Sequence, residues 1–306
     1  MPAKFDVLSL GAVAVDDLLY IGAYPGPDEK TPVLRSERRC GGMSAIAAIT
    51  ASRLGGQGAY AGVLGRDELS DFAAGQMRRE GVDLRHLARR EGVRPIHSVI
   101  MIDSRAGTRN VFFDVRGVLG AARDWPPAHV IRSARVLFID WFSVPGMIRA
   151  ARIARAAGIP VVADFEVDGL PGMATLFSLA DHLILSQSFA AKWTGLSAPG
   201  RAAVKLWTAR RQLAAVTCGA RGCYYVTAEN PAQARHQPAF KVKAVDTTGC
   251  GDVFHGAYAA ALARGMGASE RIRFAAAAAA LKAAQSGGGQ RGIPTLARTL
   301  RLMRRG

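Results

Sequence analysis

The strongest chemical signal in the sequence is a glycine-rich turn followed at once by an aspartate. Residues 246–256 read Asp-Thr-Thr-Gly-Cys-Gly-Asp-Val-Phe-His-Gly. Gly249 and Gly251 have no side chain and adopt backbone angles that are closed to other residues, so the amides of Gly249, Cys250 and Gly251 can converge on one anion. If a helix begins here, the positive end of its dipole favours the same anion. The turn therefore predicts an anion hole with one carboxylate, that of Asp252, beside it.

Asp252 has two interpretations at this point. An aspartate in the first turn of a helix often does no more than cap the helix or complement its dipole. Alternatively, Asp252 is a general base that takes a proton from a substrate hydroxyl while that oxygen attacks a phosphorus held by the turn. The spacing alone favours neither interpretation.

The surrounding sequence predicts the elements that position this turn. Phe240–Val245 alternates like a strand and Val253–Leu262 is an alanine-rich helical run, so the glycines should lie at a strand-to-helix turn. Elsewhere, strand-like runs alternate with helical stretches rich in Ala and Arg. This order predicts an α/β fold with a parallel sheet, helices on both faces, and ligands at the carboxyl ends of the strands. The strand-like runs are Phe5–Val15, Val136–Asp140, Pro160–Asp164, His182–Leu185 and Leu213–Thr217.

Two β-rich segments interrupt this alternation, at residues 18–39 and 94–118. From the residues alone they are either surface hairpins or a small separate sheet. Their alternating apolar residues distinguish them from the helical stretches around them.

Two separated motifs resemble one known family. Residues 246–252 are similar to the C-terminal signature of ribokinase-type (phosphofructokinase-B) sugar kinases, with Cys250 in place of the usual Ala. Gly41-Gly42 opens an alanine-rich run that ends in Arg-Leu-Gly at residues 53–55, which resembles the family's second signature. With smaller landmarks the resemblance extends from Gly11 to Pro294. It implies one doubly wound, ribokinase-like α/β domain over residues 1–306, with a mostly parallel central sheet and with segments 18–39 and 94–118 as a small β-sheet lid.

The resemblance also implies a chemistry, that of a carbohydrate kinase, a phosphotransferase with an alcohol group as acceptor. ATP with Mg²⁺ would give its γ-phosphate to a primary hydroxyl of a small sugar, Asp252 would be the general base, and Gly249, Cys250 and Gly251 would form the anion hole. The residues implied for the sugar are Asp16, Lys30, Gly41 and Gly42. The residues implied for the nucleotide are Thr217, Gly219, Gly222, Ala279 and Lys282. In relatives a monovalent cation such as K⁺ would lie near Asp246 and Gly287, and the lid pairs two subunits into a homodimer.

Departures from the family pattern leave the substrate open. Ile46 replaces an Asn that helps to hold the sugar, and the family's Asn-x-x-Glu is missing at residues 186–189, so metal binding would fall to water or to Asp164 and Glu166. Residues 236–256 look most like sulfofructose kinases. However, Phe113 and Phe142 stand where polar contacts to a sulfonate are expected. Sulfofructose, fructose, a ribose-like sugar and a nucleoside all remain candidates, as does a sugar-binding relative without catalysis.

The composition argues against several other classes of function. The chain has 306 residues, 49% of them hydrophobic, which is enough for a sizeable core, and no apolar run reaches the roughly 18 residues of a membrane span. We therefore expect a cytoplasmic protein without membrane association. The four cysteines lack metal-site spacing and are expected to be reduced thiols. The net charge of +16 is spread along the chain without a basic, aromatic-interleaved helix, so we expect no nucleic-acid partner.

Two other classes of α/β protein are excluded by their motifs. A P-loop nucleotidase needs Gly-x-x-x-x-Gly-Lys-Ser/Thr, which is absent from the sequence. A dinucleotide-binding oxidoreductase needs Gly-x-Gly-x-x-Gly after its first strand, where Gly11 stands alone.

Overall fold

The computed structural model describes residues 3–106, 108–285 and 289–305. Within them, an eight-stranded sheet has the order β14-β13-β12-β11-β10-β9-β1-β4. β4, β1, β9, β10, β11 and β12 run parallel, whereas β13 pairs antiparallel with both of its neighbours, β12 and β14. This sheet confirms the predicted α/β class. Its strands are β1 (Phe5–Leu10), β4 (Gly58–Tyr60), β9 (Ala134–Ile139), β10 (Val161–Ala163), β11 (His182–Ser186), β12 (Leu213–Thr217), β13 (Cys223–Thr227) and β14 (Arg235–Gln237).

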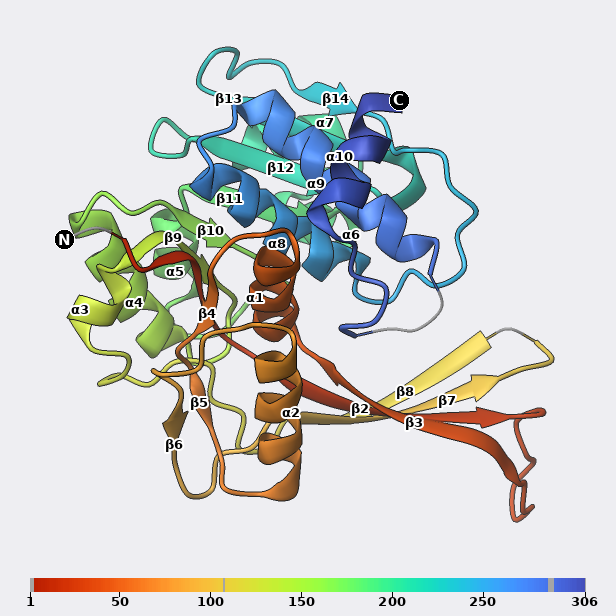
Figure 1. The fold of residues 1–306 in the computed structure, drawn as a ribbon. Helices are drawn as coiled ribbons and strands as arrows, with labels where there is room; N and C mark the ends of the chain where they lie inside the picture. The colour runs from red at the N-terminus through yellow and green to blue at the C-terminus, as the bar shows by residue number, and fades with distance from the viewer. Residues whose placement is uncertain (1–2, 107, 286–288, 306) are drawn as a thin grey trace.

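Helices cover both faces of the central sheet (Figure 1). Because side chains alternate along a strand, β9 contributes Phe138 to the core on one face and Leu137 to the core on the other. The first layer holds α1 (Met43–Arg53), α2 (Glu68–Arg79), α8 (Cys250–Ala263), α9 (Ala268–Ala283) and α10 (Leu296–Arg305). The second holds α3 (Ala128–Ile131), α4 (Val144–Ala156), α5 (Met173–Leu179), α6 (Gln187–Thr194) and α7 (Pro199–Leu206). In the described part of the chain, none of the helices has the length and apolar character needed to cross a bilayer.

A second sheet, here called the lid, projects from the body of the molecule (Figure 1). Its strand order is β3-β2-β7-β8, and its strands come from the two segments for which a lid was predicted. The first hairpin is longer than the predicted segment 18–39, because it begins at Ala14 and ends at Gly41. Its strands are β2 (Ala14–Ile21), β3 (Val33–Gly41), β7 (Ile96–Asp103) and β8 (Thr108–Asp114). A two-stranded ladder joins β5 (Val63–Leu64) to β6 (Ala88–Arg89), and a short 3₁₀ helix, η1, spans Gly219–Arg221.

The structure corrects two predicted strands. The run Phe5–Val15 is not one strand, because β1 ends at Leu10 in the central sheet and β2 begins at Ala14 in the lid. The run Phe240–Val245 forms no strand at all. Its residues instead make one wall of a pocket, and at its end the amide of Val245 donates to the carbonyl of Ala283 at the end of α9. The alternation of apolar residues there therefore does not reflect pairing with a neighbouring strand.

Candidate active site

The glycine turn opens α8 as predicted. Gly249 precedes the helix in a left-handed conformation with φ of 76°, and the amide of Cys250 donates to the carbonyl of Thr247 at 3.2 Å. A Cβ atom added to Gly251 would meet no atom within 4 Å, and Gly251 lines the adjacent pocket. Packing within the protein therefore does not require a glycine here. The open space at Gly251 fits an anionic ligand that approaches the amides at the start of α8.

Asp252 lies in the first turn of α8 and is partly buried. Burial raises the pKa of Asp252 to about 7, and the charges of Asp164 and Glu166 add to this effect. A carboxyl group with a pKa near neutrality is matched to proton transfer at physiological pH. This property favours the general-base interpretation over simple helix capping.

Two further aspartates follow neighbouring parallel strands at their carboxyl ends. Asp140, after β9, is fully buried and accepts hydrogen bonds from the amides of Ala12 at 2.6 Å and Phe142 at 2.9 Å. Burial raises the pKa of Asp140 to about 7. Asp164, after β10, is also buried, and its pKa is raised by burial and by the charge of Glu166. Asp140 was not among the predicted site residues, although it closes the predicted strand Val136–Asp140.

His255 joins the first turn of α8 to the sheet. Its Nδ1 lies 2.8 Å from the carbonyl oxygen of Gly251 and 3.3 Å from Asp164 Oδ2, and its Nε2 lies 3.0 Å from the carbonyl oxygen of Ile184. The side chain is almost completely buried. It thus holds the turn and the carboxylate cluster in a fixed relative position.

Asp16 lies on the lid side of the site. In β2 it stands opposite Arg39 of β3 and Ser98 of β7. Burial raises the pKa of Asp16, against the effect of a hydrogen bond with Ser98, and the charge of Asp16 in turn raises the pKa of Asp252. A Cβ atom on Gly41 would lie 2.5 Å from Asp16 Oδ2, so the glycine makes room for this carboxylate. Gly42 follows as the residue that precedes α1. The structure thus brings together Asp16, Gly41 and Gly42.

Lys30 does not join them. It is exposed in the loop between β2 and β3, at the far end of the lid (Figure 1). The lid strand from Asp16 to Ile21 already spans about 16 Å at roughly 3.3 Å per residue, and Lys30 lies beyond it. The structure therefore does not bring Lys30 together with Asp16 in one chain, and a contact between Lys30 and the sugar stays a prediction.

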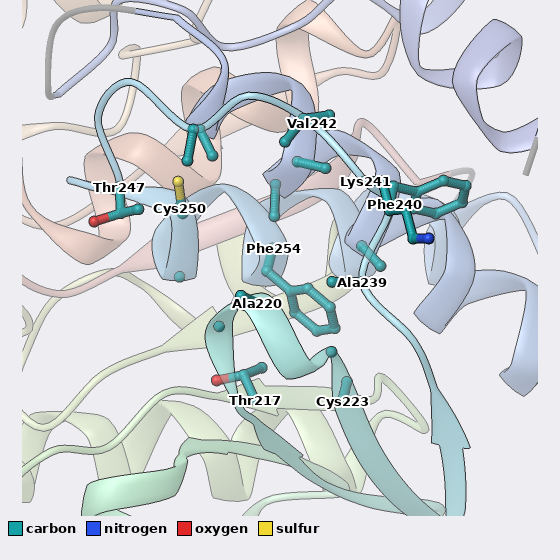
Figure 2. A pocket seen from close by; sticks show the side chains of 18 residues that line it. Thr217, Ala220, Cys223, Ala239, Phe240, Lys241, Val242, Thr247, Cys250 and Phe254 are labelled. Atoms are coloured by element: carbon teal, nitrogen blue, oxygen red, sulfur yellow. The ribbon is translucent and has the colours of Figure 1, made fainter.

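A pocket of about 540 Å³ lies beside the turn and contains four of the five predicted nucleotide residues, Thr217, Gly219, Gly222 and Ala279. Figure 2 shows Phe254 of α8 and Phe240 of the loop before it at two sides of this pocket, with Thr217 and Cys223 at its base. The alanines of α9 that line it are Ala276, Ala279, Ala280 and Ala283. A mostly apolar cavity that ends at an amide-lined turn suits a flat base with an anionic tail.

Lys282, the fifth predicted nucleotide residue, is completely buried and is not among the residues that line the pocket. Burial lowers the pKa of Lys282, and the charges of Asp246 and Cys250 oppose this effect. Lys282 is therefore close enough to the turn to interact with its charges, and it does not line the pocket predicted for the nucleotide.

Asp246 is the first residue of the turn and interacts with two cations, Arg109 and Lys282. Its Oδ1 accepts from the amide of Thr248 at 2.8 Å and lies 3.7 Å from Arg109 Nη1, and the charge of Lys282 also acts on it. Burial raises the pKa of Asp246, but the hydrogen bonds with Thr248 lower it by more, so the pKa lies below its usual range. Gly287, the other residue implied for a monovalent cation, lies outside the described residues. The cation site stays a prediction.

Magnesium fits this site only together with phosphate. Among the residues that the structure describes, no three His, Cys, Asp or Glu side chains form a ready metal cage. Mg²⁺ usually binds through one or two carboxylates plus phosphate oxygens and water. Asp164 and Glu166 would be the carboxylates available for this purpose, because both lie close enough to Asp252 to raise its pKa. Ser186, in the segment without Asn-x-x-Glu, instead caps α6 through its hydroxyl.

Comparisons with known proteins agree with this geometry. The model of the pfkB family of carbohydrate kinases matches residues 6–296. The ribokinase of Staphylococcus aureus is 26% identical over 95% of this chain and 97% of its own length. The probable fructokinase-3 of Arabidopsis thaliana is 29% identical over 71% of this chain and 67% of its own. The structure of Arabidopsis thaliana ribokinase in complex with ribose and ATP is similar in fold, with a TM-score of 0.84, 23% identity and 99% of each chain covered.

The family match spans the turn at 246–252, the Gly41-Gly42 pair and both segments of the lid. Carbohydrate kinases transfer phosphate to sugars. A turn suited to an anion, beside a carboxyl group of raised pKa, agrees with this activity. The fold, the doubly wound sheet and the lid are those expected from the sequence. The chain therefore belongs to the pfkB family of carbohydrate kinases.

Proposed function

We propose that the chain transfers the γ-phosphate of ATP to a primary hydroxyl of a small sugar, with Asp252 as the general base. The observation that carries this proposal is the position of Asp252. Its carboxyl group, with a pKa raised to about 7, directly follows the open amide turn and is close enough to Asp16 for their charges to interact. The pocket that reaches Cys250 and Gly251 adjoins the same turn. A phosphate on the turn and a hydroxyl beside Asp252 would then be in position to react.

The chemical step follows from this placement. The amides of Gly249, Cys250 and Gly251 would stabilise the negative charge on the transferring phosphoryl group. Asp252 would take the hydroxyl proton as the bond from the sugar oxygen to phosphorus forms and the bond to the bridging oxygen of ADP breaks. Asp16 would orient the sugar through hydrogen bonds to its other hydroxyls. A positioned base of this kind usually contributes about 10²–10⁴ in rate.

ATP would lie with its base in the pocket between Phe240 and Phe254 and its phosphates on the turn. The similar ribokinase fold that holds ribose and ATP supports this assignment. Mg²⁺, held by phosphate oxygens and by Asp164 or Glu166, would neutralise part of the phosphate charge. The site would operate in the cytoplasm, where ATP is available.

A neutral pentose or hexose is the substrate that we favour. The relatives include a ribokinase and a fructokinase. Phe113 and Phe142 offer no hydrogen bond to a sulfonate, which counts against sulfofructose. A nucleoside is the alternative acceptor. It would need room for its base beyond the sugar.

The lid has an apolar surface that supports a homodimer. Phe113 of β8 is 68% exposed and stands opposite Ser98, which itself stands opposite Asp16. Residues paired in this way share one face of the sheet. A partner lid packed on this face would bury Phe113 and close the sugar site at the same time. Sedimentation of F113D should give the mass of a monomer where the wild type gives that of a dimer, and equal masses would contradict this arrangement.

The direct test of the kinase function is ADP release from ATP and Mg²⁺ with a panel of acceptors. The panel contains ribose, fructose, other ketoses and aldoses, sulfofructose, phosphosugars and nucleosides. We expect acceptor-dependent turnover that falls at least 10²-fold in D252N. D168N is the matched control, because Asp168 pairs with Lys192 at 2.7 Å on the surface.

A sugar-binding protein without catalysis is the competing function. The Ile46 substitution and the missing Asn-x-x-Glu are the observations behind it. Calorimetry that detects sugar binding, with no ADP release from any panel member, would favour this function and contradict the kinase.

A further inference from the structure

Arg109 of the lid reaches the catalytic turn of the body. Its Nη1 donates to Thr248 Oγ1 at 2.6 Å and lies 3.7 Å from Asp246 Oδ1, although 139 residues separate Arg109 from Thr248. Thr248 directly precedes Gly249, and consecutive Cα atoms are about 3.8 Å apart. The guanidinium group is therefore held next to the amides that form the anion hole.

The register of the lid explains this direction. In β8, Arg109, Val111 and Phe113 lie two residues apart and share one face of the sheet. Phe113 stands opposite Ser98, and Ser98 stands opposite Asp16, so this is also the face that carries the sugar-binding carboxylate. The lid thus carries Asp16 and Arg109 on the same face, with Arg109 opposite Ile102 farther along the lid.

Arg109 is suited to bind more than Thr248. A guanidinium group has five N–H donors, and both contacts with the turn run through Nη1. The Nε and Nη2 atoms carry three further N–H groups. The side chain is 48% exposed, which leaves it room to shift toward a ligand.

A cation at this site would offset the negative charge of the nearby carboxylates. A phosphoryl group on the turn would lie among carboxylates, because Asp252, Asp164 and Glu166 already act on one another. Planar guanidinium groups bind phosphate oxygens in a bidentate manner and stabilise the charge that is spread over a transferring phosphoryl group.

We propose that Arg109 binds the transferring phosphoryl group, so that closing the lid over the sugar also completes the charge stabilisation of the reaction. This proposal rests on the kinase function proposed above. Arg109 donates hydrogen bonds to phosphoryl oxygens throughout the transfer and exchanges no proton. The alternative is that Arg109 only latches the lid to Thr248.

Kinetics of the full-length enzyme distinguish the two roles, with the best acceptor from the panel. If Arg109 binds the phosphoryl group, R109A should lower kcat at least 10²-fold and change the KM for the sugar less than about threefold. Added guanidinium should restore part of the kcat of R109A. R116A is the matched lid control with wild-type kinetics, because Arg116 pairs with Asp114 on the surface.

A second measurement does not depend on turnover. The complex of sugar, ADP, Mg²⁺ and aluminium fluoride imitates the transferring phosphoryl group. R109A should weaken this complex at least tenfold in calorimetry while binding of ADP alone is unchanged.

Three outcomes would overturn the proposal. The first is wild-type kcat in R109A. The second is that R109A and T248V have the same effect and that this effect is a raised KM for the sugar. Such a result would mean that Arg109 only holds the lid to Thr248. The third is equal binding of the aluminium fluoride complex by wild type and R109A. A wild type that turns over no acceptor would contradict the kinase function itself, and this proposal with it.

Discussion

His255 and Asp164 form a buried pair directly behind the proposed catalytic base. His255 Nδ1 lies 3.3 Å from Asp164 Oδ2, and both side chains are almost completely buried. His255 follows Asp252 by three residues on α8, close to one helical turn. The charge of Asp164 raises the pKa of Asp252 while that of His255 lowers it. Burial is the main cause of the raised pKa of Asp252, and the two members of the pair shift this pKa in opposite directions.

The rate should rise with pH through neutrality. Asp252 must be deprotonated to act as a base, and burial raises its pKa to about 7. We expect kcat/KM to increase from acid pH and to level off above about pH 7. ADP release measured across this range tests the prediction. A profile that falls between pH 6 and pH 8 would contradict it.

Replacing His255 should move that profile. H255Q removes a group whose charge lowers the pKa of Asp252, so the acid limb of kcat/KM should move to higher pH by more than about half a unit. The matched control is H236Q, because His236 is exposed on β14 and stacks on Tyr224. An acid limb at the wild-type pH in H255Q would show that the pair is only structural.

Removing the charge of Asp252, the proposed base, should stabilise the fold at alkaline pH. The pKa of Asp252 in the folded chain exceeds its ordinary value of 3.8, so the folded state binds more protons between pH 3.8 and about pH 7. Stability is lost as pH rises through this window, because ionised Asp252 is partly buried beside other carboxylates. D252N should therefore have a higher Tm than the wild type at pH 8 and a similar Tm near pH 4. Thermal unfolding by circular dichroism tests this, and a lower Tm at pH 8 would refute it.

Two glycines should respond in opposite ways to alanine. G251A should fold with an unchanged or higher Tm, because its Cβ meets no protein atom and alanine favours a helix. Its KM for ATP should rise at least tenfold if the phosphates rest on this turn. G222A should lose stability, because Gly222 has φ of 91° and a Cβ there would lie 2.1 Å from the carbonyl oxygen of Gln237. Tm and ATP kinetics of both variants, measured together, test the pair.

Short motifs in the sequence predicted much of the local structure at the candidate site. The glycine turn with Asp252 lies within seven residues, and its shape depends on glycine backbone freedom and on the start of α8. The pair Gly41-Gly42 before α1 and the pocket residues Thr217 and Gly222 were likewise readable from short motifs. Phe240–Val245 shows the limit of such patterns, because alternation also arises where one side of a loop lines a pocket.

The sequence by itself determined the α/β class, the lid segments and the turn that carries Asp252, because each depends on residues close together in the chain. Only the tertiary structure decided that Asp140 and Asp164 come close enough for their charges to interact, that Arg109 reaches Thr248, and that Lys30 is exposed in the loop between β2 and β3. These placements depend on strand order and register, which bring distant segments together. Periodicity along one segment carries no information about which other segment it will meet.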